Sequence, residues 1–297
     1  MSTDPNLAIF QAERRRLAGL AYRMTGSVTE SEDILQQAWI IWSRQRPDRI
    51  ESPGKWLGTI VTRLCLDFLK SAHRRRETYI GAWLPEPWLQ DEAPDAEQDW
   101  IVTEDVSIAL ILTLDKLTPE MRAGFILRDA FDFSFDEIAT VVGRSPENCR
   151  QLVSRARRRI AGAEMPAQIP TQDAQQITKA FWQASRGGDM QALLDLFTEE
   201  VEIHTDGGGK VPAAMNVLKG KDRAARFFVG IARKGLVRSQ PFPPLRRING
   251  SPGVVSVELG DVVQTTALDI RDGRIAAVWI TRNPDKLRHL QGNPAIC

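Results

Sequence analysis

Residues 133–160 read FSFDEIATVVGRSPENCRQLVSRARRRI, and this stretch predicts two short helices joined by a tight turn. Apolar residues recur at helical spacing up to Val142, and Gly143 ends that stripe with a backbone conformation that a side chain would hinder. Ser145 suits an N-cap and Pro146 suits the first helical position, so a second helix begins at once. The pattern is typical of a helix-turn-helix.

The second of these helices gathers its polar residues on the face opposite its apolar stripe. Arg and Gln can pair with purine edges, Glu can accept from cytosine, and further arginines can hold phosphates, so we expect this helix to enter the major groove of DNA. The alternative is a basic helix end that only faces water, but the turn residue, the cap and both apolar stripes favour DNA. The candidate DNA-binding residues of this segment are Arg144, Glu147, Asn148, Arg150, Gln151, Ser154, Arg155 and Arg158.

Charged residues are balanced over the whole chain but not along it. The 297 residues include 39 Lys and Arg against 38 Asp and Glu, which gives a net charge of +1. Between Glu86 and Asp105 every charged residue is acidic, whereas basic clusters lie before this segment at Arg74–Arg76 and after it at Arg155–Arg159. The distribution of charge therefore says more about partners than the net charge does.

Cysteine content and hydropathy indicate the compartment. Cys65, Cys149 and Cys297 are odd in number and far apart, and the sequence shows no apolar signal segment and no long apolar run. We therefore expect reduced thiols in a cytoplasmic protein. The spacing of cysteines and histidines suggests no zinc site, and we expect no cofactor.

Length and hydrophobic pattern divide the chain into several domains, because 297 residues exceed the usual size of one. The first two blocks read as helical, and Thr29 with Glu32 forms an expected capping box at a helix start. The acidic segment between them reads as a linker without a core of its own. The expected boundaries are 1–80 and 106–164 for the helical blocks, 81–105 for the linker, and 172–290 for a block of helices followed by antiparallel strands.

Two resemblances to known families follow from longer motifs. The first two blocks resemble regions 2 and 4 of bacterial sigma factors of the extracytoplasmic-function (ECF) group. The third block resembles a SnoaL-like domain of the nuclear-transport-factor-2 (NTF2) superfamily, and three short motifs match the ECF subgroup in which such a fused domain is implicated in regulation. The sigma motifs are TESEDILQQAW at 29–39, SPGKWLGTIVTRLCLDFLK at 52–70 and LTPEMR at 117–122, continuing to Arg157; the subgroup motifs are WLPEP at 83–87, DGGGK at 206–210 and NPDKL at 283–287.

The resemblance implies a multidomain fold, with two all-α sigma domains, a helical bundle and a helix-turn-helix, followed by a cone-shaped α+β NTF2-like domain. It implies a sigma factor that directs promoter-specific transcription initiation and is regulated in cis by its C-terminal domain. The implied partners are promoter DNA and the RNA polymerase core, through the beta-prime clamp helices and the beta flap. A membrane and a separate anti-sigma protein are not expected, and a small ligand in the C-terminal domain is left open.

The resemblance also assigns roles to residues. Polymerase clamp binding is implied for Glu32, Asp33, Gln36 and Gln37, whose alternative is a solvated polar face. Binding of the minus-ten element is implied for Arg49, Ile50, Glu51, Lys55, Arg63, Lys70 and Arg74. Interdomain regulation is implied for Trp83, Pro85, Glu86, Asp206, Gly207, Gly208, Gly209, Lys210, Asn283, Pro284, Asp285, Lys286 and Leu287. In free protein we expect Trp83–Pro87 to rest against the C-terminal domain, since two nearby tryptophans do not favour permanent exposure.

An enzymatic C-terminal domain is the alternative function, because related SnoaL-like domains are cyclases and isomerases that use an Asp or His as acid or base. His204 and Asp206 share one face of an expected strand. The Gly-Gly-Gly run after Asp206 suits an exposed loop better than a rigid catalytic site. We therefore expect a regulatory module and no enzyme.

Overall fold

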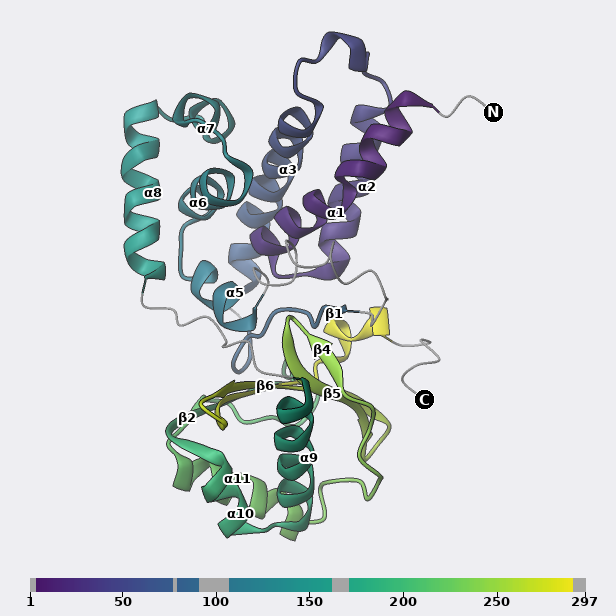
Figure 1. The fold of residues 1–297 in the computed structure, drawn as a ribbon, viewed down its shortest axis with the longest axis vertical. Helices are drawn as coiled ribbons and strands as arrows, with labels where there is room; N and C mark the ends of the chain where they lie inside the picture. Colours follow the sequence, from purple (N-terminus) through teal and green to yellow (C-terminus); the bar gives the residue numbers. More distant parts are fainter. Residues whose placement is uncertain (1–3, 77–78, 91–106, 162–170, 291–297) are drawn as a thin grey trace. The chain divides into compact units, whose positions relative to one another are not determined.

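The computed structural model describes residues 4–76, 79–90, 107–161 and 171–290 (Figure 1). These residues fall into two compact units. The first unit contains residues 1–78 and 97–164, and the second contains residues 79–96 and 165–297. The first part of the expected linker thus belongs to the same unit as the C-terminal domain.

The first unit begins with a helical bundle of α1 (Pro5–Thr25), α2 (Val28–Trp42) and α3 (Pro53–Arg76), with the short helix η1 (Pro47–Arg49) before α3. Leu17, Leu20 and Trp42 are fully buried in it. Helix α2 starts earlier than the sequence suggested, because Ser27 accepts a hydrogen bond from the Glu30 amide at 3.1 Å. The expected capping box of Thr29 and Glu32 was therefore wrong.

The first unit continues with α5 (Ile108–Asp115), α6 (Pro119–Phe131), α7 (Phe135–Val142) and α8 (Pro146–Ile160). The predicted helix-turn-helix is confirmed: α7 ends at Gly143, whose φ is 71°, and Ser145 caps α8 by accepting from the Asn148 amide at 3.2 Å. A Cβ added to Gly124 of α6 would lie 3.4 Å from Val153 of α8, so this glycine allows the two helices to pack closely.

The second unit is built on a sheet with the strand order β1-β4-β5-β6-β7-β2-β3. Neighbouring strands are antiparallel, except that β2 and β7 are parallel, which differs from the expected run of antiparallel strands. The long chain segment between β2 and β7 lets β7 return beside β2 in the same direction. The strands are β1 (Leu89–Gln90), β2 (Phe197–Asp206), β3 (Leu218–Lys219), β4 (Arg246–Ile248), β5 (Ser251–Glu258), β6 (Val262–Arg271) and β7 (Arg274–Thr281).

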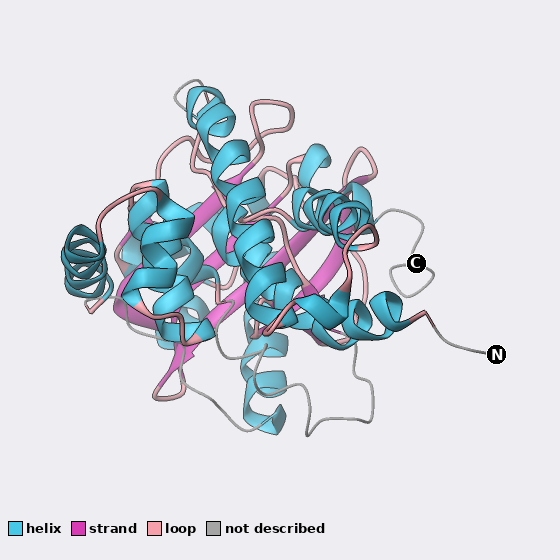
Figure 2. Ribbon diagram, turned by 90° about the horizontal axis from the view of Figure 1, so that it is seen from above, coloured by secondary structure: helices cyan, strands magenta, loops and turns pink. Residues whose placement is uncertain are grey.

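Helices α9 (Thr171–Gly187), α10 (Met190–Leu196) and α11 (Lys221–Arg233) lie on one side of this curved sheet (Figure 1). Figure 2 shows the strands of the sheet from above. Phe181, Phe197 and Phe228 lie in the apolar core between helices and sheet. Two short helices, η3 (Pro284–Lys286) and η4 (Arg288–Leu290), follow the last strand. This architecture matches the expected α+β domain, although the sequence interpretation missed α11.

Residues 79–90 differ from a linker without a core. Leu84, Pro85 and Pro87 are buried in the second unit, and β1 pairs with β4. The rest of the expected linker, 91–105, lies outside the described residues. Within the described ranges, no helix is long and apolar enough to cross a membrane. No group of three or more His, Cys, Asp or Glu that could hold a metal ion occurs among those same residues.

Candidate DNA-binding and regulatory sites

Helix α8 has one apolar and one polar face, as its sequence predicts. Cys149, Val153 and Ala156 are buried. The eight candidate DNA-binding residues of this segment are all exposed: Arg144, Glu147, Asn148, Arg150, Gln151, Ser154, Arg155 and Arg158. The arrangement leaves a mixed polar and cationic helix face open to a partner such as the major groove.

Phe135 and Asp129 contact arginines near this face. The Phe135 ring lies between two guanidinium groups, with its centroid 5.1 Å from Cζ of Arg128 and 5.4 Å from Cζ of Arg150. Both distances fall within the range of cation–π attraction. Arg157 instead forms an ion pair with Asp129 at 2.5 Å, so its guanidinium is engaged within the unit.

The candidate minus-ten residues do not all lie free on the surface. Lys55 forms an ion pair with Glu137 of α7 at 2.8 Å, and Arg63 donates to the carbonyl of Thr140 at 3.1 Å. The hydrogen bond from Lys55 holds the pKa of Glu137 below its usual value. Two candidate DNA-binding side chains of the first bundle are therefore bound to the helix-turn-helix, which the sequence could not indicate.

The other candidates of this group are distributed differently. Arg49 and Glu51 are exposed, Ile50 is half-buried, and Lys70 pairs with Asp67 one turn earlier on α3. The side chain of Arg74 lies outside the described residues. The exposed Arg49 and Glu51 flank the loop before α3, which leaves that loop accessible.

Arg122 joins the two halves of the first unit, and sequence reasoning gave it no role. Its side chain is 5% exposed and donates to the carbonyls of Leu114 at 2.9 Å and of Met24 at 2.5 Å, and it pairs with Asp115 at 2.9 Å. Burial lowers the pKa of Arg122 to about 10. The available signal was an arginine inside an otherwise apolar stripe of α6.

The candidate polymerase-binding residues lie together on α2. Asp33, Gln36 and Gln37 are exposed, and Glu32 accepts a hydrogen bond from Arg14 at 2.6 Å. Ile40, one turn further along the same helix, is 51% exposed. An exposed apolar side chain beside polar residues is a suitable contact surface for a protein partner.

Asp206, the last residue of β2, is the centre of a second candidate site. Its Oδ1 accepts from the hydroxyl of Tyr79 at 2.5 Å and from the amide of Gly208 at 3.0 Å. Its Oδ2 accepts from the amide of Leu84 at 2.9 Å and from Nζ of Lys286 at 2.6 Å. We call Tyr79, Leu84, Asp206, Asn283 and Lys286 the linker clasp.

The linker clasp is buried and closed by further contacts. The side chains of Asp206 and Lys286 are 0% and 10% exposed. Lys286 also donates to the carbonyl of Leu84 and lies 4.5 Å from the centroid of the Trp83 ring, while Asn283 donates to the hydroxyl of Tyr79 at 2.8 Å. Burial, reinforced by the hydrogen bond to Asp206, raises the pKa of Tyr79, so its hydroxyl remains a neutral donor.

The expected contact of the WLPEP motif with the C-terminal domain is therefore confirmed, and it extends further along the chain. His289 Nε2 lies 2.8 Å from the carbonyl of Pro87. Trp88 and Asn249 exchange hydrogen bonds, since the Trp88 amide donates to Asn249 Oδ1 at 3.1 Å and the Asn249 amide donates to the Trp88 carbonyl at 2.9 Å. The pairing of β1 with β4 follows directly.

The glycine run of the DGGGK motif allows backbone to approach this site closely. A Cβ on Gly208, whose φ is 59°, would lie 2.2 Å from Asn283 Nδ2, and a Cβ on Gly209 would lie 2.9 Å from Ile80. At Gly207 it would lie 2.3 Å from the carbonyl oxygen of Val211. Side chains at these positions would displace the groups around Asp206.

The remaining candidates of the regulatory set lie around the edge of the linker clasp. Lys210 and Arg288 both form ion pairs with Asp285, whose side chain is 41% exposed. Hydrogen bonding by Lys210 lowers the pKa of Asp285. Leu287 is buried, whereas Glu86 and Pro284 are half-buried. The structure thus brings the three motifs together, with buried contacts at Asp206 and exposed ones at Asp285.

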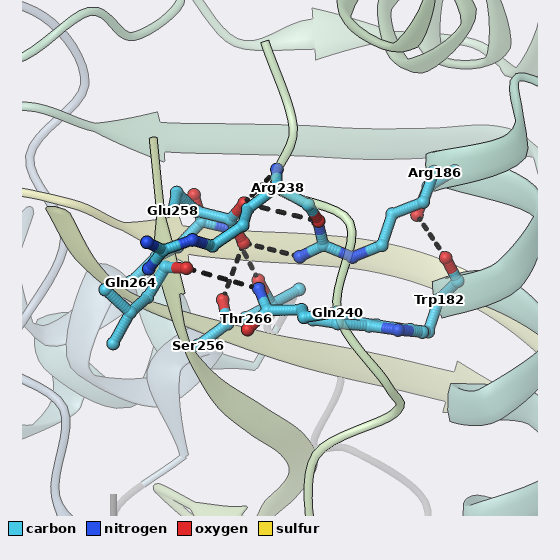
Figure 3. A network of polar contacts seen from close by, with 10 residues as sticks. Trp182, Arg186, Arg238, Gln240, Ser256, Glu258, Gln264 and Thr266 are labelled. Carbon is cyan, nitrogen blue, oxygen red and sulfur yellow. Dashed lines mark hydrogen bonds and ion pairs between the residues drawn. The ribbon is translucent and has the colours of Figure 1, made fainter. Parts of the chain in front are cut away.

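The residues considered for catalysis are occupied by other contacts. Asp206 belongs to the linker clasp, and His204 Nε2 lies 3.0 Å from Glu202, which also pairs with Lys219. A separate polar network lies between α9 and β5, where Arg186 makes an ion pair with Glu258 and Ser256 donates to Glu258 at 2.8 Å (Figure 3). Burial alone would raise the pKa of Glu258, but hydrogen bonds from Arg186 and Ser256 hold it below its usual value. A carboxylate kept ionised by an arginine is a poor proton donor.

Comparisons with known proteins agree with this architecture. Family models of Sigma-70 region 2 and Sigma-70 region 4 match residues 9–75 and 107–160. The chain is 37% identical over 292 residues to the ECF RNA polymerase sigma factor SigJ of Mycobacterium tuberculosis, covering 93% of this chain and 91% of SigJ. It is 29% identical over 296 residues to the probable ECF sigma factor SigI of that organism, covering 97% of each chain.

A solved structure gives the same result for nearly the complete chain. The crystal structure of SigJ from Mycobacterium tuberculosis aligns with a TM-score of 0.75 at 33% identity, covering 97% of this chain and 99% of SigJ. An NTF2-like protein from Burkholderia xenovorans aligns with a TM-score of 0.31 at 22% identity, covering 41% of this chain and 98% of its own. The chain belongs to the family of ECF RNA polymerase sigma factors, and its sigma regions 2 and 4 are followed by an α+β C-terminal domain.

Proposed function

We propose that the NTF2-like domain regulates this sigma factor in cis by holding the segment between regions 2 and 4 in the linker clasp. The observation that carries the proposal is the buried carboxylate of Asp206, which accepts hydrogen bonds from Tyr79 and Leu84 of that segment. As a sigma factor the chain acts with core RNA polymerase at promoters. Because this segment connects regions 2 and 4, holding it restricts how these two regions can be placed on promoter DNA.

Chain connectivity explains how such a contact can regulate. Helix α3 ends at Arg76 and α5 begins at Ile108. While residues 79–90 are held on the C-terminal domain, region 4 is joined to that domain by two segments, residues 91–107 and residues 161–170, and the shorter one reaches at most roughly 35 Å when fully extended. Release of the linker clasp frees residues 77–107 as one longer connection between regions 2 and 4. The clasp therefore limits the separations that regions 2 and 4 can adopt.

The energetic requirement is modest. Contacts within one chain benefit from a high effective concentration, so the linker clasp needs no affinity comparable to that of a separate inhibitor. A coupling of about 1–3 kcal/mol between the clasp and promoter binding changes promoter affinity by up to roughly a hundredfold. In this proposal the C-terminal domain takes the place of a separate anti-sigma protein.

The proposed DNA contacts follow the exposed surfaces. The polar face of α8 reads the minus-thirty-five element, with Arg150 and Gln151 on base edges and Arg158 on phosphate. The loop and helix from Arg49 to Lys70 hold the minus-ten element. Lys55 and Arg63 serve there only after they leave Glu137 and Thr140. Promoter binding and the packing of region 2 on region 4 therefore compete for the same side chains.

The proposed polymerase contact is the exposed face of α2. Asp33, Gln36 and Gln37 supply polar groups there, and Ile40 supplies apolar area. The clamp of the polymerase core is the corresponding partner. Glu32 joins this contact once it is released from Arg14.

Run-off transcription with core polymerase tests the regulatory proposal. We compare the full chain, a chain truncated after Gly162, and the Asp206→Ala variant, with Asp173→Ala as a control because Asp173 is exposed on α9. We expect the truncation and Asp206→Ala to change promoter output, and Asp173→Ala to leave it unchanged. Unchanged output from both altered chains, at equal protein level, would show that the C-terminal domain does not regulate.

An enzymatic role for the C-terminal domain has less support. The carboxylate of Asp206 is engaged by four donors, and Glu258 is paired with Arg186. Neither group is placed to exchange a proton with a substrate. Conversion of a cyclic apolar substrate that is lost on His204→Ala would restore this second candidate.

A further inference from the structure

Helix α11 of the NTF2-like domain has a strongly cationic outer face. Ala224, Ala225, Phe228 and Val229 form its buried stripe. The opposite face carries Arg223, Arg226, Arg233 and Lys234, all of them exposed, and the exposed Asp222 lies at its N-terminal edge. At about 100° per residue these four side chains and Gly230 fall within an arc of roughly 100° on one side of the helix.

These cations differ from their neighbours in lacking carboxylate partners. Lys219 pairs with Glu202, Lys221 pairs with Glu199, and Arg186 pairs with Glu258. Within the part of the chain that the structure describes, none of Arg223, Arg226, Arg233 and Lys234 takes part in an ion pair. A row of unpaired positive charge repels itself, and an anionic partner relieves this repulsion.

Gly230 in the middle of this face is a second, independent observation. A glycine inside a helix destabilises it relative to alanine. A Cβ built on Gly230 meets no atom within 4 Å in the described structure, so packing within the chain does not require the glycine. The glycine instead leaves helix backbone bare between the cationic side chains, which permits close approach by something outside the chain.

We propose that this surface, the α11 basic face (Arg223, Arg226, Gly230, Arg233 and Lys234), binds the sugar–phosphate backbone of promoter DNA. From residue 223 to 234 a helix advances about 16 Å, which is enough to meet several consecutive phosphates of a strand. Arginine and lysine contacts to phosphate add affinity without reading sequence. The NTF2-like domain then contributes directly to promoter affinity, independently of the linker clasp.

The experiment measures the affinity of the assembled holoenzyme for a promoter duplex as a function of salt concentration. The test variant combines Arg223→Gln, Arg226→Gln and Arg233→Gln. The control removes the same number of charges from exposed positions elsewhere in the domain, by Lys179→Gln, Arg247→Gln and Arg274→Gln. Each lost phosphate contact reduces the salt slope by roughly 0.9, so we expect the test variant to lower it by about 2–3 and to weaken low-salt affinity on the order of tenfold.

Equal losses for the test and control variants would overturn the proposal, since a general charge effect would explain both. Binding to core polymerase is measured without DNA in the same series. A loss confined to that step would assign the α11 basic face to polymerase and would also overturn the proposal. Thermal unfolding of each variant shows whether the domain remains folded.

The Gly230→Ala variant tests whether the α11 basic face binds DNA closely or only faces water. Alanine fits without a clash and favours a helix, so the variant should unfold at a higher temperature than the parent. If phosphates approach the bare backbone, the same variant binds promoter DNA several-fold more weakly. Higher thermal stability with unchanged DNA affinity and salt slope would contradict a close phosphate contact and would leave the face without the proposed partner.

Discussion

The linker clasp and the Lys55–Glu137 contact both tie parts of the sigma factor together, but they differ in burial. The paired side chains of Asp206 and Lys286 are 0% and 10% exposed, whereas those of Lys55 and Glu137 are 41% and 37% exposed. Removing one partner of a buried pair leaves an uncompensated charge, while an exposed pair is worth little and is screened by salt. The molecule thus holds its linker firmly and its candidate DNA-binding side chain Lys55 loosely.

The largest expected effect comes from breaking the buried contact. Asp206→Ala leaves Lys286 without its carboxylate and Tyr79 and Leu84 without an acceptor, at a cost on the order of 3–5 kcal/mol. Because residues 79–90 can then leave the surface, we expect the domain to stay folded while the Leu84 amide exchanges its hydrogen on the order of a hundredfold faster or more. Asp285→Ala is the control, since Asp285 is 41% exposed, and equal acceleration in both variants would contradict the special role of Asp206.

A smaller loss of stability is expected from removing the buried side chain of Arg122, which connects regions 2 and 4. Arg122→Leu removes the donor to Met24 and Leu114 and the partner of Asp115, with an expected loss on the order of 3 kcal/mol. Denaturant unfolding of the variant should begin with separation of region 2 from region 4, detected by a fluorophore pair on α1 and α6. Unfolding in one step at the parent's midpoint would show that Arg122 does not join the regions.

The next comparison, on the exposed face of α8, is between the side chains proposed to read bases and the one proposed to hold phosphate. Arg150→Ala or Gln151→Ala should relax preference at one base pair, by about 1–3 kcal/mol. Arg158→Ala should weaken all promoters alike and reduce the salt slope by about 1. Binding to a library of minus-thirty-five variants measures both effects, and the same loss on every sequence for all three substitutions counts against base reading.

The smallest effect is expected at Lys55–Glu137. Glu137→Gln weakens an exposed pair worth about 1 kcal/mol or less, so isolated protein should bind promoter DNA up to about fivefold better, and less so in high salt. Since Lys55 lowers the pKa of Glu137 below 4.5, the contact is fully present above that pH and is lost as the pH falls through the lower folded value. Fluorophores on α3 and α7 should report this opening, with Asp136→Asn as the exposed control on α7.

Local signals explain which parts of the fold could be predicted. Gly143, Ser145 and Pro146 lie within a few residues of one another and specify the turn and the cap of α8 without help from the rest of the chain. The pattern KDRAARFFVGIAR of α11 was equally readable, with small and aromatic residues at helical spacing, but it was overlooked between strand signals. The parallel pairing of β2 with β7 has no local sequence signal, because it depends on the path of the long segment that connects the two strands.

Long-range pairing explains what the sequence left open. The motifs located most residues of the linker clasp but not Tyr79, which is 127 positions from Asp206, and no periodicity tells which donor a carboxylate will meet. Lys55 and Glu137 are 82 positions apart, and nothing in the sequence around either residue indicates that the two pair with each other. Charge and exposure follow from sequence patterns, whereas the choice of partner follows from packing.

The strand pairing of β1 with β4 also bears on how this protein can be handled. Leu89 and Gln90 cover part of the outer edge of β4, whose Arg247 and Ile248 are their partners. Whenever residues 79–90 leave the NTF2-like domain, β4 becomes an open sheet edge with unpaired amide and carbonyl groups. A strand edge of this kind accepts extended chain from another molecule, so a protein with a released linker is prone to self-association. The segment proposed to restrain the sigma regions thus also covers a sheet edge that would otherwise favour aggregation.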